Sequence, residues 1–436
     1  MRIDDGYKMT EVGVIPKDWE VVSFGDIVEY IKGFAFKSTD YCTDGIRIIR
    51  ISDTTYDSIK DDNAIYINVN SYIKHRKWEL LESDLVFSTV GSKPPMYDSL
   101  VGKVILITKK YAGSLLNQNA VLIRNKEKNM YLQRLLLNHF RTKRYVKYIE
   151  TIFRGNANQA SITLADLFKF PIPLPPSKDE QTAISTALYD VDELMQSLEK
   201  LIDKKRAIRQ GAMQELLTGK RRLQEYAKKN EEYKRTEVGI IPVDWDNISM
   251  GEVGQIIIGL TYSPSNVKEY GTLVLRSSNV QNGKLAFDDN VYVDMELPSR
   301  VIVKKDDILI CVRNGSRQLI GKCALIDEKA EDSAFGAFMS LYRSQYSKFI
   351  YYQFQTNIIQ KQIDEVMGAT INQITNKDLS TFKIALPKEI DEQRAIVKVL
   401  SDMDAEITAL EAKLEKYKKI KQGMIQNLLT GKIRLI

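Results

Sequence analysis

The sequence predicts two α/β (α+β) globular domains in one chain, separated by two long helices that form an antiparallel coiled coil, with an internal pseudo-two-fold repeat. Three observations predict this fold class. An opening motif occurs twice, a heptad-patterned segment follows each copy, and the segments between them contain short β-branched runs. With 436 residues, the chain is long enough for two domains with cores of their own.

The opening motif is "TEVGVIPKDW" (10–19), and it returns nearly unchanged as "TEVGIIPVDW" (236–245). Closing motifs recur as well: "DEQTAI" from Asp179 matches "DEQRAI" from Asp391, and both halves end on "LLTGK". Between these ends the match weakens to pairs such as "VGKVILI" and "IGKCALI". We therefore expect two duplicated halves with similar ends and divergent middles.

The middles contain β-branched runs that predict strands, namely "GIRIIRIS", "DLVFSTV", "KVILITK", "TLVLRSS" and "DILICVR". The runs "QIIIGL" and "DILICV" are typical of buried strands. The stretch "YLQRLLLNHFRTKRYVKYIE" (131–150) predicts one amphipathic helix. Each half is thus expected to be an α/β globule followed by a long helix.

Each long helix carries an apolar seam at heptad spacing. The seam residues are Val191, Met195, Leu198 and Ile202 in the first helix, and Met403, Ile407, Leu410, Leu414, Tyr417, Met424 and Leu428 in the second, where Lys421 fills one position. Pro175, Pro176 and Pro387 would stop the helices from growing backwards, and Gly219 and Gly431 would end them beside Lys220 and Lys432.

A heptad helix cannot bury its seam alone, so the two helices are expected to pair, and the chain path makes that pairing antiparallel. Each opening motif should then receive the end of a helix, with the terminal "LLTGKIRLI" close to "TEVGVIPKDW". The predicted segments are a first domain at 1–178, a central helical region at 179–222, a second domain at 223–388 and a C-terminal helical region at 389–436.

Composition narrows the function classes. Hydrophobic residues make up 44%, charged residues 28%, and the formal net charge is +6, which permits a polyanionic partner without requiring one. Three cysteines without paired spacing and two histidines make a zinc site or a disulfide framework unexpected. The polar start "MRIDDGYKMT" and the lack of a long apolar run predict a soluble cytoplasmic protein that does not span a membrane.

Catalytic motifs are approached but not completed. In "SKPPMYD" (92–98), Lys93 stands where an adenine methyltransferase loop needs Asn, and no Gly-rich cofactor loop precedes it. "GSRQLIGKC" (315–323) departs from a phosphate-binding loop in spacing and ends on Cys323 in place of a hydroxyl. "EAK" (411–413) lies in the heptad helix, where a solvated face explains it. The chain is therefore predicted not to be an enzyme, with no catalytic and no metal-binding residues.

Polar residues that suit base reading recur at parallel places in both globules. "IKGFAFKS" parallels "IIGLTYSP", "IIRISD" parallels "VLRSSN", and "FRGNANQAS" parallels "VMGATINQIT", while "CVRNGSR" adds two arginines around an Asn-Gly turn. Arg reads guanine edges, and Asn or Gln reads adenine edges, in bidentate geometry. The candidate DNA-binding residues are Lys32, Phe36, Lys37, Arg50, Ser52, Lys93, Arg154, Asn156, Asn158, Gln159, Tyr262, Arg276, Ser278, Asn279, Arg313, Asn314, Ser316, Arg317, Asn372 and Gln373.

The opening motif, the "PLPP…DEQ" entry to a long helix, the "LLTGK" exit and their recurrence together resemble the specificity subunit of type I restriction–modification systems, over essentially the whole chain. This resemblance implies two target recognition domains that read the halves of an asymmetric bipartite site on double-stranded DNA. It also implies docking of two modification (methyltransferase) subunits and of restriction (endonuclease/translocase) subunits. S-adenosylmethionine, ATP and Mg would bind those partners, and no cofactor would bind this chain.

Two other function classes stay open at this point. A self-sufficient duplicated-domain DNA methyltransferase would need a cofactor motif that the sequence does not display. A coiled-coil adaptor without nucleic-acid binding is compatible with the mild net charge, and the salt dependence of DNA binding would separate it from a DNA-reading protein.

Overall fold

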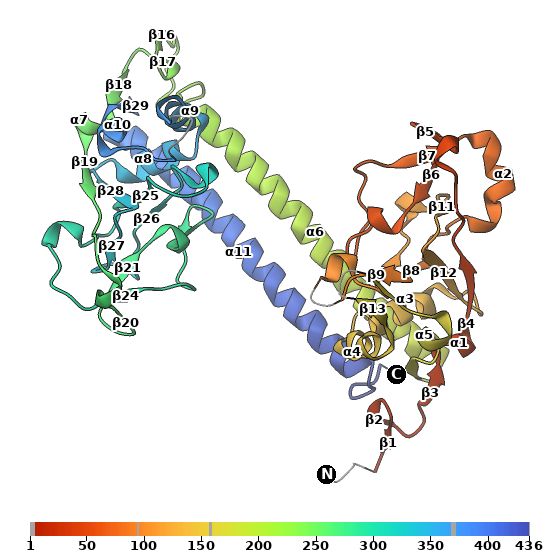
Figure 1. Ribbon diagram of the computed structural model, residues 1–436. Helices are drawn as coiled ribbons and strands as arrows, with labels where there is room; N and C mark the ends of the chain where they lie inside the picture. Colours follow the sequence, from red (N-terminus) through yellow and green to blue (C-terminus); the bar gives the residue numbers. More distant parts are fainter. Residues whose placement is uncertain (1–4, 94–95, 157–158, 368–371, 436) are drawn as a thin grey trace. The chain divides into compact units, whose positions relative to one another are not determined.

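The structure, a computed structural model, describes residues 5–93, 96–156, 159–367 and 372–435. It divides into two compact units: residues 1–199 with 412–436 form the first, and residues 200–411 form the second. Each unit combines an α/β domain with parts of both long helices (Figure 1). Within the described ranges, none of the helices combines the length and apolarity that crossing a membrane requires.

The first unit contains two four-stranded sheets of short strands, whose order in each sheet differs from their order along the chain. One is antiparallel in the order β10-β8-β12-β4, and the other has the order β11-β6-β7-β5, with β11 parallel to β6. Their bounds are β4 Val28–Lys32, β5 Tyr41–Cys42, β6 Ile46–Ile49, β7 Ile65–Ile67, β8 Leu85–Ser88, β10 Val104–Leu106, β11 Leu115–Leu116 and β12 Ala120–Asn125.

The second unit repeats both sheets strand for strand, in the orders β19-β28-β25-β26 and β20-β24-β21-β27. The bounds are β19 Gln255–Ile258, β20 Val267–Lys268, β21 Thr272–Leu275, β24 Tyr292–Val293, β25 Ile308–Cys311, β26 Cys323–Leu325, β27 Ala334–Phe335 and β28 Met339–Arg343. The predicted strands are confirmed, and the duplication extends through the divergent middles.

One strand prediction needs correction. The run "QIIIGL" forms β19, which lies at the end of its sheet beside β28 and is therefore an edge strand rather than a buried one. Ile258 is 61% exposed, and Ile256 and Ile257 are half-buried. By contrast, "DILICV" forms β25 between two neighbours and is buried throughout. An edge position exposes side chains that a central position would cover, and an apolar run does not distinguish the two.

The repeated opening motifs form hairpins, β1–β2 and β16–β17, and the strand that follows each hairpin pairs with the strand before the next long helix, as β3–β15 and β18–β29. Their bounds are β1 Tyr7–Thr10, β2 Gly13–Pro16, β3 Glu20–Ser23, β15 Pro171–Leu174, β16 Tyr233–Thr236, β17 Gly239–Pro242, β18 Trp245–Ser249 and β29 Lys383–Pro387. The remaining short elements are α1 Phe24–Ile27, α2 Tyr72–His75, β9 Val90–Gly91, β13 Arg154–Asn156, β14 Gln159–Ser161, α5 Leu164–Leu167, α7 Met250–Val253, β22 Val280–Gln281, β23 Lys284–Leu285 and α10 Asn376–Thr381.

The single amphipathic helix expected at 131–150 is two helices, α3 (Met130–Phe140) and α4 (Lys143–Ile152). Thr142 breaks the run, because its side-chain oxygen caps α4 by accepting from the backbone N–H of Tyr145 at 3.3 Å. The second unit has the same break between α8 (Ser347–Phe354) and α9 (Asn357–Val366). The prediction followed hydrophobic period alone and missed the capping residue.

The long helices are α6 (Lys178–Leu216) and α11 (Ile390–Leu428), and each unit pairs them antiparallel. In the second unit Arg206 contacts Glu411, whereas Arg209, further along α6, contacts the earlier Asp404. The predicted seam is confirmed: Leu198, Ile202, Ile407, Leu414 and Leu428 are buried, and Val191, Met195, Met403, Leu410, Tyr417 and Met424 are half-buried.

The charged position in the seam also repeats. Lys421 forms an ion pair with Asp192 in the first unit, and Arg209 forms one with Asp404 at the corresponding place in the second. Both basic side chains are mostly covered, so each needs its carboxylate opposite, and a shifted register would leave a covered charge without a partner.

The end of each helix returns to an opening motif. Arg434, beyond α11, binds Glu180 (2.7 Å) and Asp18 (2.9 Å), and Arg222, beyond α6, binds Glu392 (2.7 Å) and Asp244 (2.9 Å). Gly431 has φ +67°, and a Cβ there would lie 2.5 Å from Pro16; the pair Gly219 and Pro242 repeats this geometry. The expected proximity of "LLTGKIRLI" to "TEVGVIPKDW" is confirmed.

The Arg222 cluster should contribute strongly to stability. The Arg222 side chain is 4% exposed and Glu392 is 1% exposed, so Arg222→Ala leaves a buried carboxylate without its partner. We expect the free energy of unfolding in urea to fall by about 3 kcal/mol or more. Arg434→Ala should cost less because Arg434 is more exposed, and the control Arg206→Ala, in an exposed pair, should cost less than about 1 kcal/mol. Equal losses for all three variants would contradict this ranking.

A histidine in the first core should make stability depend on pH. Burial lowers the pKa of His139 from 6.5 to about 3. The unfolded chain therefore binds a proton first as pH falls, so stability is complete above pH 6.5 and is lost toward pH 3. Urea unfolding should show a loss of about 2 kcal/mol between pH 6.5 and about pH 5. His139→Gln should remove most of this slope, and His75→Gln should not.

Candidate nucleic-acid interface

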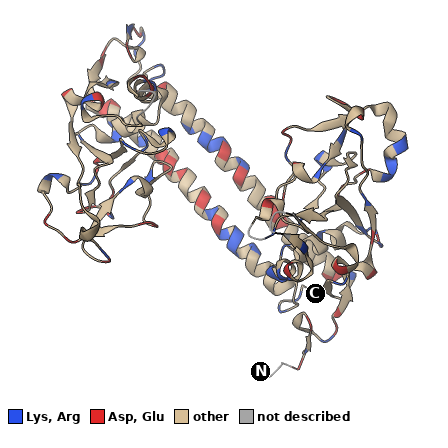
Figure 2. Cartoon of the chain, in the orientation of Figure 1, with Lys and Arg blue, Asp and Glu red and all other residues tan. Residues whose placement is uncertain are grey.

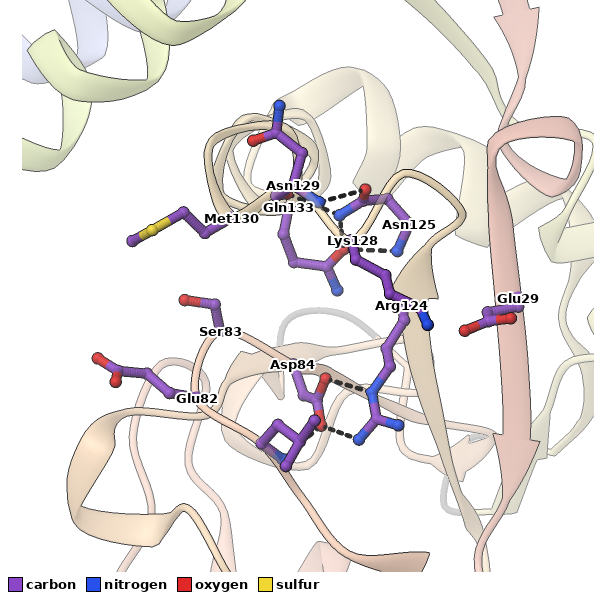
Figure 3. Close-up of a pocket in the computed structure, with 11 residues that line it drawn as sticks. Glu29, Glu82, Ser83, Asp84, Arg124, Asn125, Lys128, Asn129, Met130 and Gln133 are labelled. Atoms are coloured by element: carbon purple, nitrogen blue, oxygen red, sulfur yellow. Dashed lines mark hydrogen bonds and ion pairs between the residues drawn. The ribbon is translucent and has the colours of Figure 1, made fainter. Parts of the chain in front are cut away.

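Both domains contain the same ion pair between a half-buried arginine and a buried aspartate. In the first, Arg124 donates two hydrogen bonds to Asp84, at 2.7 Å each, across a cleft of about 260 Å³ (Figure 3). In the second, Arg343 donates to Asp307 at 2.8 and 2.6 Å. The cleft also holds Gln133, whose Nε2 donates to the Ile123 carbonyl and whose Oε1 accepts from Asn125. These groups bind one another and tie α3 to the sheet, so the cleft serves the scaffold.

Four predicted residues of the second domain, Arg313, Asn314, Asn372 and Gln373, lie in one loop cluster. Arg313 pairs with Gln373 as an isolated β-bridge, and its guanidinium lies over the exposed ring of Phe338, 5.1 Å from the centroid. Asn314 donates from Nδ2 to the Ser277 hydroxyl at 2.9 Å, and Asn372 donates to the Gly315 carbonyl at 3.0 Å. Arg313 is exposed, and within the described part of the chain its guanidinium is held by the Phe338 stack, which leaves its N–H groups available to a ligand.

The first domain has a matching cluster with different side chains. The backbone bond from Ile162 to Thr89 corresponds to the bond from Ile374 to Val312, which places Val90 where the second domain has Arg313. The sheet β9-β14-β13 continues from there. Lys93 lies 4.4 Å from the Phe153 ring centroid, and Arg154 is exposed beside Asp166.

A turn held by a lysine lies next to each cluster. The 3-10 turns are Ile51–Asp53 and Ser277–Asn279. Lys103 donates to the Thr54 carbonyl at 2.7 Å, and Lys322 donates to the Val280 carbonyl at 2.9 Å. Burial lowers the pKa of Lys103 to about 8. The turn and Lys103 line a cleft of about 560 Å³ whose other polar side chains include Arg50, Lys60, Gln118 and Asn119.

Two predicted contacts are wrong. Phe36 is 7% exposed and packs with Ile48, Ile67 and Leu115, so its ring belongs to a core. Asn279 is fully buried; its Nδ2 donates to the Ala286 carbonyl and its Oδ1 accepts from the Arg276 backbone. Phe36 packs in a core and Asn279 closes a turn, so neither side chain is free to reach DNA.

Three predicted arginines, Arg50, Arg154 and Arg276, have carboxylate partners within their own domain. Arg50 binds Asp53 at 2.7 Å and the Asn63 carbonyl at 2.8 Å, and Arg276 binds Asp289 at 2.9 Å. Tyr262 packs against the core of the second domain, and the Ser278 hydroxyl oxygen is buried. Lys32, Lys37, Ser52, Ser316 and Arg317 are exposed. Asn158, like Pro94 and Pro95, lies outside the described residues, and of Asn156 and Gln159 only the backbone is described.

Sequence reasoning missed several residues of these clusters, namely Phe338, Gln118, Asn119, Lys103 and Lys322. Phe338 is 25 positions from Arg313 along the chain, so the stack follows only from the fold. The sequence did contain a signal for Lys103 and Lys322, because each is the one lysine in the matched motifs "VGKVILI" and "IGKCALI".

The chain matches the family described as type I restriction modification DNA specificity domain over residues 16–205 and 242–422. The MjaX specificity subunit of Methanocaldococcus jannaschii is 30% identical, over 99% of this chain and 97% of that one. The MjaVIII specificity subunit of the same organism is 25% identical, over 97% and 94%.

Solved structures agree on the fold. The type I restriction–modification S subunit from M. genitalium has a TM-score of 0.58 at 15% identity, and the match covers 98% of each chain. A chain from a structure of type I R-M complex assembly has a TM-score of 0.53 at 17% identity, covering 96% of this chain and 99% of that one. With a family match over most of its length, this chain belongs to the type I restriction–modification DNA specificity family, whose members are the non-catalytic, DNA-recognition subunits of such systems.

Proposed function

We propose that this chain reads an asymmetric bipartite site on double-stranded DNA, one half with each domain. The observation that supports this most directly is the contrast between scaffold and loops. The two domains share their strand orders, their arginine–aspartate pairs and their lysine-held turns. On this common scaffold, the second domain has Arg313 and Phe338 where the first has Val90 and Asn119, and it adds Gln373 beside Arg313. Side chains of different hydrogen-bonding capacity would select different bases.

Two modification subunits would dock on the duplicated structure, and restriction subunits would join them. S-adenosylmethionine, ATP and Mg would be held by those partners, and the assembly would work in the cytoplasm. The relatives support this partnership, since they are named specificity subunits of type I restriction enzymes, and one similar structure comes from work on complex assembly. A self-sufficient methyltransferase and an adaptor without DNA binding are set aside by the family membership.

The proposal is tested by mapping methylation in DNA from cells that express this chain with its modification subunits. We expect one split, asymmetric site, and a palindromic site for the intact chain would contradict the proposal. Arg313→Ala should relax one base position in one half and weaken binding there by about 1–3 kcal/mol. The exposed Arg235 on the second hairpin provides the control, since Arg235→Ala should leave the base preference unchanged. Uniform weakening by Arg313→Ala on all sequences would make it a phosphate contact.

The first half of the chain should imitate the whole as a dimer. A fragment of residues 1–223 carries Asp192 and Arg209, and also Glu180 and Arg222, so a second copy can supply the opposite charge that the missing half of the chain provides to each. An antiparallel pairing of two α6 helices would restore both kinds of ion pair across a true two-fold axis. Sedimentation should show a dimer, and Arg209→Asp should abolish it. With modification subunits the dimer should methylate a palindromic split site; the original asymmetric site would contradict the scheme.

A further inference from the structure

The first domain carries a surface segment that the second domain lacks. In both domains, a side chain fastens the connection that follows β7 or β24 to the end of an edge strand. Trp78 donates to the Lys32 carbonyl at 3.0 Å, and Arg300 donates to the Ile258 carbonyl at 2.7 Å. The connections that precede these anchors are residues 68–77 and the shorter 294–299. The longer one folds into α2 and a following 3-10 turn.

These corresponding connections have opposite charge. Residues 68–77, "NVNSYIKHRK", contain Lys74, Arg76 and Lys77 and no carboxylate. Residues 294–299, "DMELPS", contain two carboxylates and no basic residue. Figure 2 shows α2 as a basic segment at the outer side of the first domain. A polyanion would therefore be attracted to this segment in the first domain and repelled from its counterpart in the second.

An aromatic cluster fixes the position of the basic segment. The Phe34 ring lies 4.4 Å from the Trp78 ring and 4.8 Å from His75, and Phe36 lies 5.0 Å from His75, as centroid distances. Both phenylalanines belong to "IKGFAFKS", so the cluster holds the basic segment against the stretch between the exposed Lys32, at the end of β4, and the exposed Lys37. The basic side chains thus project from a packed support.

The exposed side chains of this segment do little for the fold. Among the described residues, no carboxylate pairs with Lys74 or Lys77, and Arg76 is 78% exposed with its Nε 3.9 Å from Glu79. Ile73, next to them, is 83% exposed. Like charges next to one another repel, and an exposed isoleucine is unfavourable in water, so this surface is destabilising when nothing is bound to it. A bound polyanion would neutralise the charges and cover the isoleucine.

We propose that the basic turn, defined as residues 72–78, is a DNA-backbone contact of the first domain, in which Lys74, Arg76 and Lys77 bind phosphates of the duplex. This inference rests on the proposed function and extends it, because it makes the two domains unequal in how firmly they hold DNA. The first domain would supply a larger share of the salt-dependent binding, and the second would rely more on its base-reading loops.

The test measures the binding of the full chain to a mixed-sequence duplex over a range of salt concentrations. Each phosphate contact contributes about 0.9 to the slope of log affinity against log salt concentration. The triple variant Lys74→Ala, Arg76→Ala, Lys77→Ala should therefore lower the slope by about 2 to 3. The variant Lys74→Arg, Lys77→Arg should keep it. Replacing residues 68–77 with the sequence of residues 294–299 should lower it at least as much as the triple variant.

The matched control is the triple variant Lys413→Ala, Lys416→Ala, Lys419→Ala, which removes the same charge from an exposed face of α11. An equal fall in slope for the control would show that the slope depends on net charge alone, which would overturn the inference. An unchanged slope for the basic-turn variant would also overturn the inference. If that variant kept the slope but lost binding to a modification subunit, the turn would be a protein contact instead. If the parent chain and its assembly with modification subunits fail to bind the duplex, the proposed function falls as well.

Discussion

The arginine that follows each long helix is the interaction on which the rest of the structure depends. Arg222 and Arg434 each join three parts of the fold: the end of one helix, the first turn of the other, and the Asp that precedes Trp in the opening motif. Because the partner Glu180 and Glu392 are almost fully covered, the guanidinium is required for their burial. The opening motif therefore recurs because each copy completes one such cluster, which is a structural reason independent of DNA.

In the pairing of α6 with α11, apolar residues provide the packing and charged residues specify the register. Leucines and isoleucines along α6 and α11 would tolerate a slip of one heptad, since another apolar residue would take each place. Lys421 with Asp192 and Arg209 with Asp404 would not tolerate it, because a slip leaves covered charges without counter-charges. The polar position that interrupts the predicted seam is thus the position that specifies register.

The sequence alone was sufficient for the duplication, the helices, most strands and the family, because these features are written in repeated motifs and in local periodicity. The sequence was insufficient where the role of a residue depends on neighbours that are distant along the chain. Phe36 and Asn279 have the composition of contact residues but are buried by packing that no local pattern records. Arg313 stays a predicted DNA contact, and its support, Phe338, emerged only from the fold. Thr142 shows the opposite case, a local capping signal that hydrophobic period obscured.

The two lysines that hold the turns have an evolutionary consequence. Lys103 and Lys322 fasten the presenting turns through backbone carbonyls, which every amino acid possesses, so the hold does not depend on the side chains that the turns display. Substitutions on the outer surface can then accumulate with little effect on the foundation beneath them. Point mutations of the displayed side chains could therefore give the protein a new target sequence while the hold on each turn stays the same.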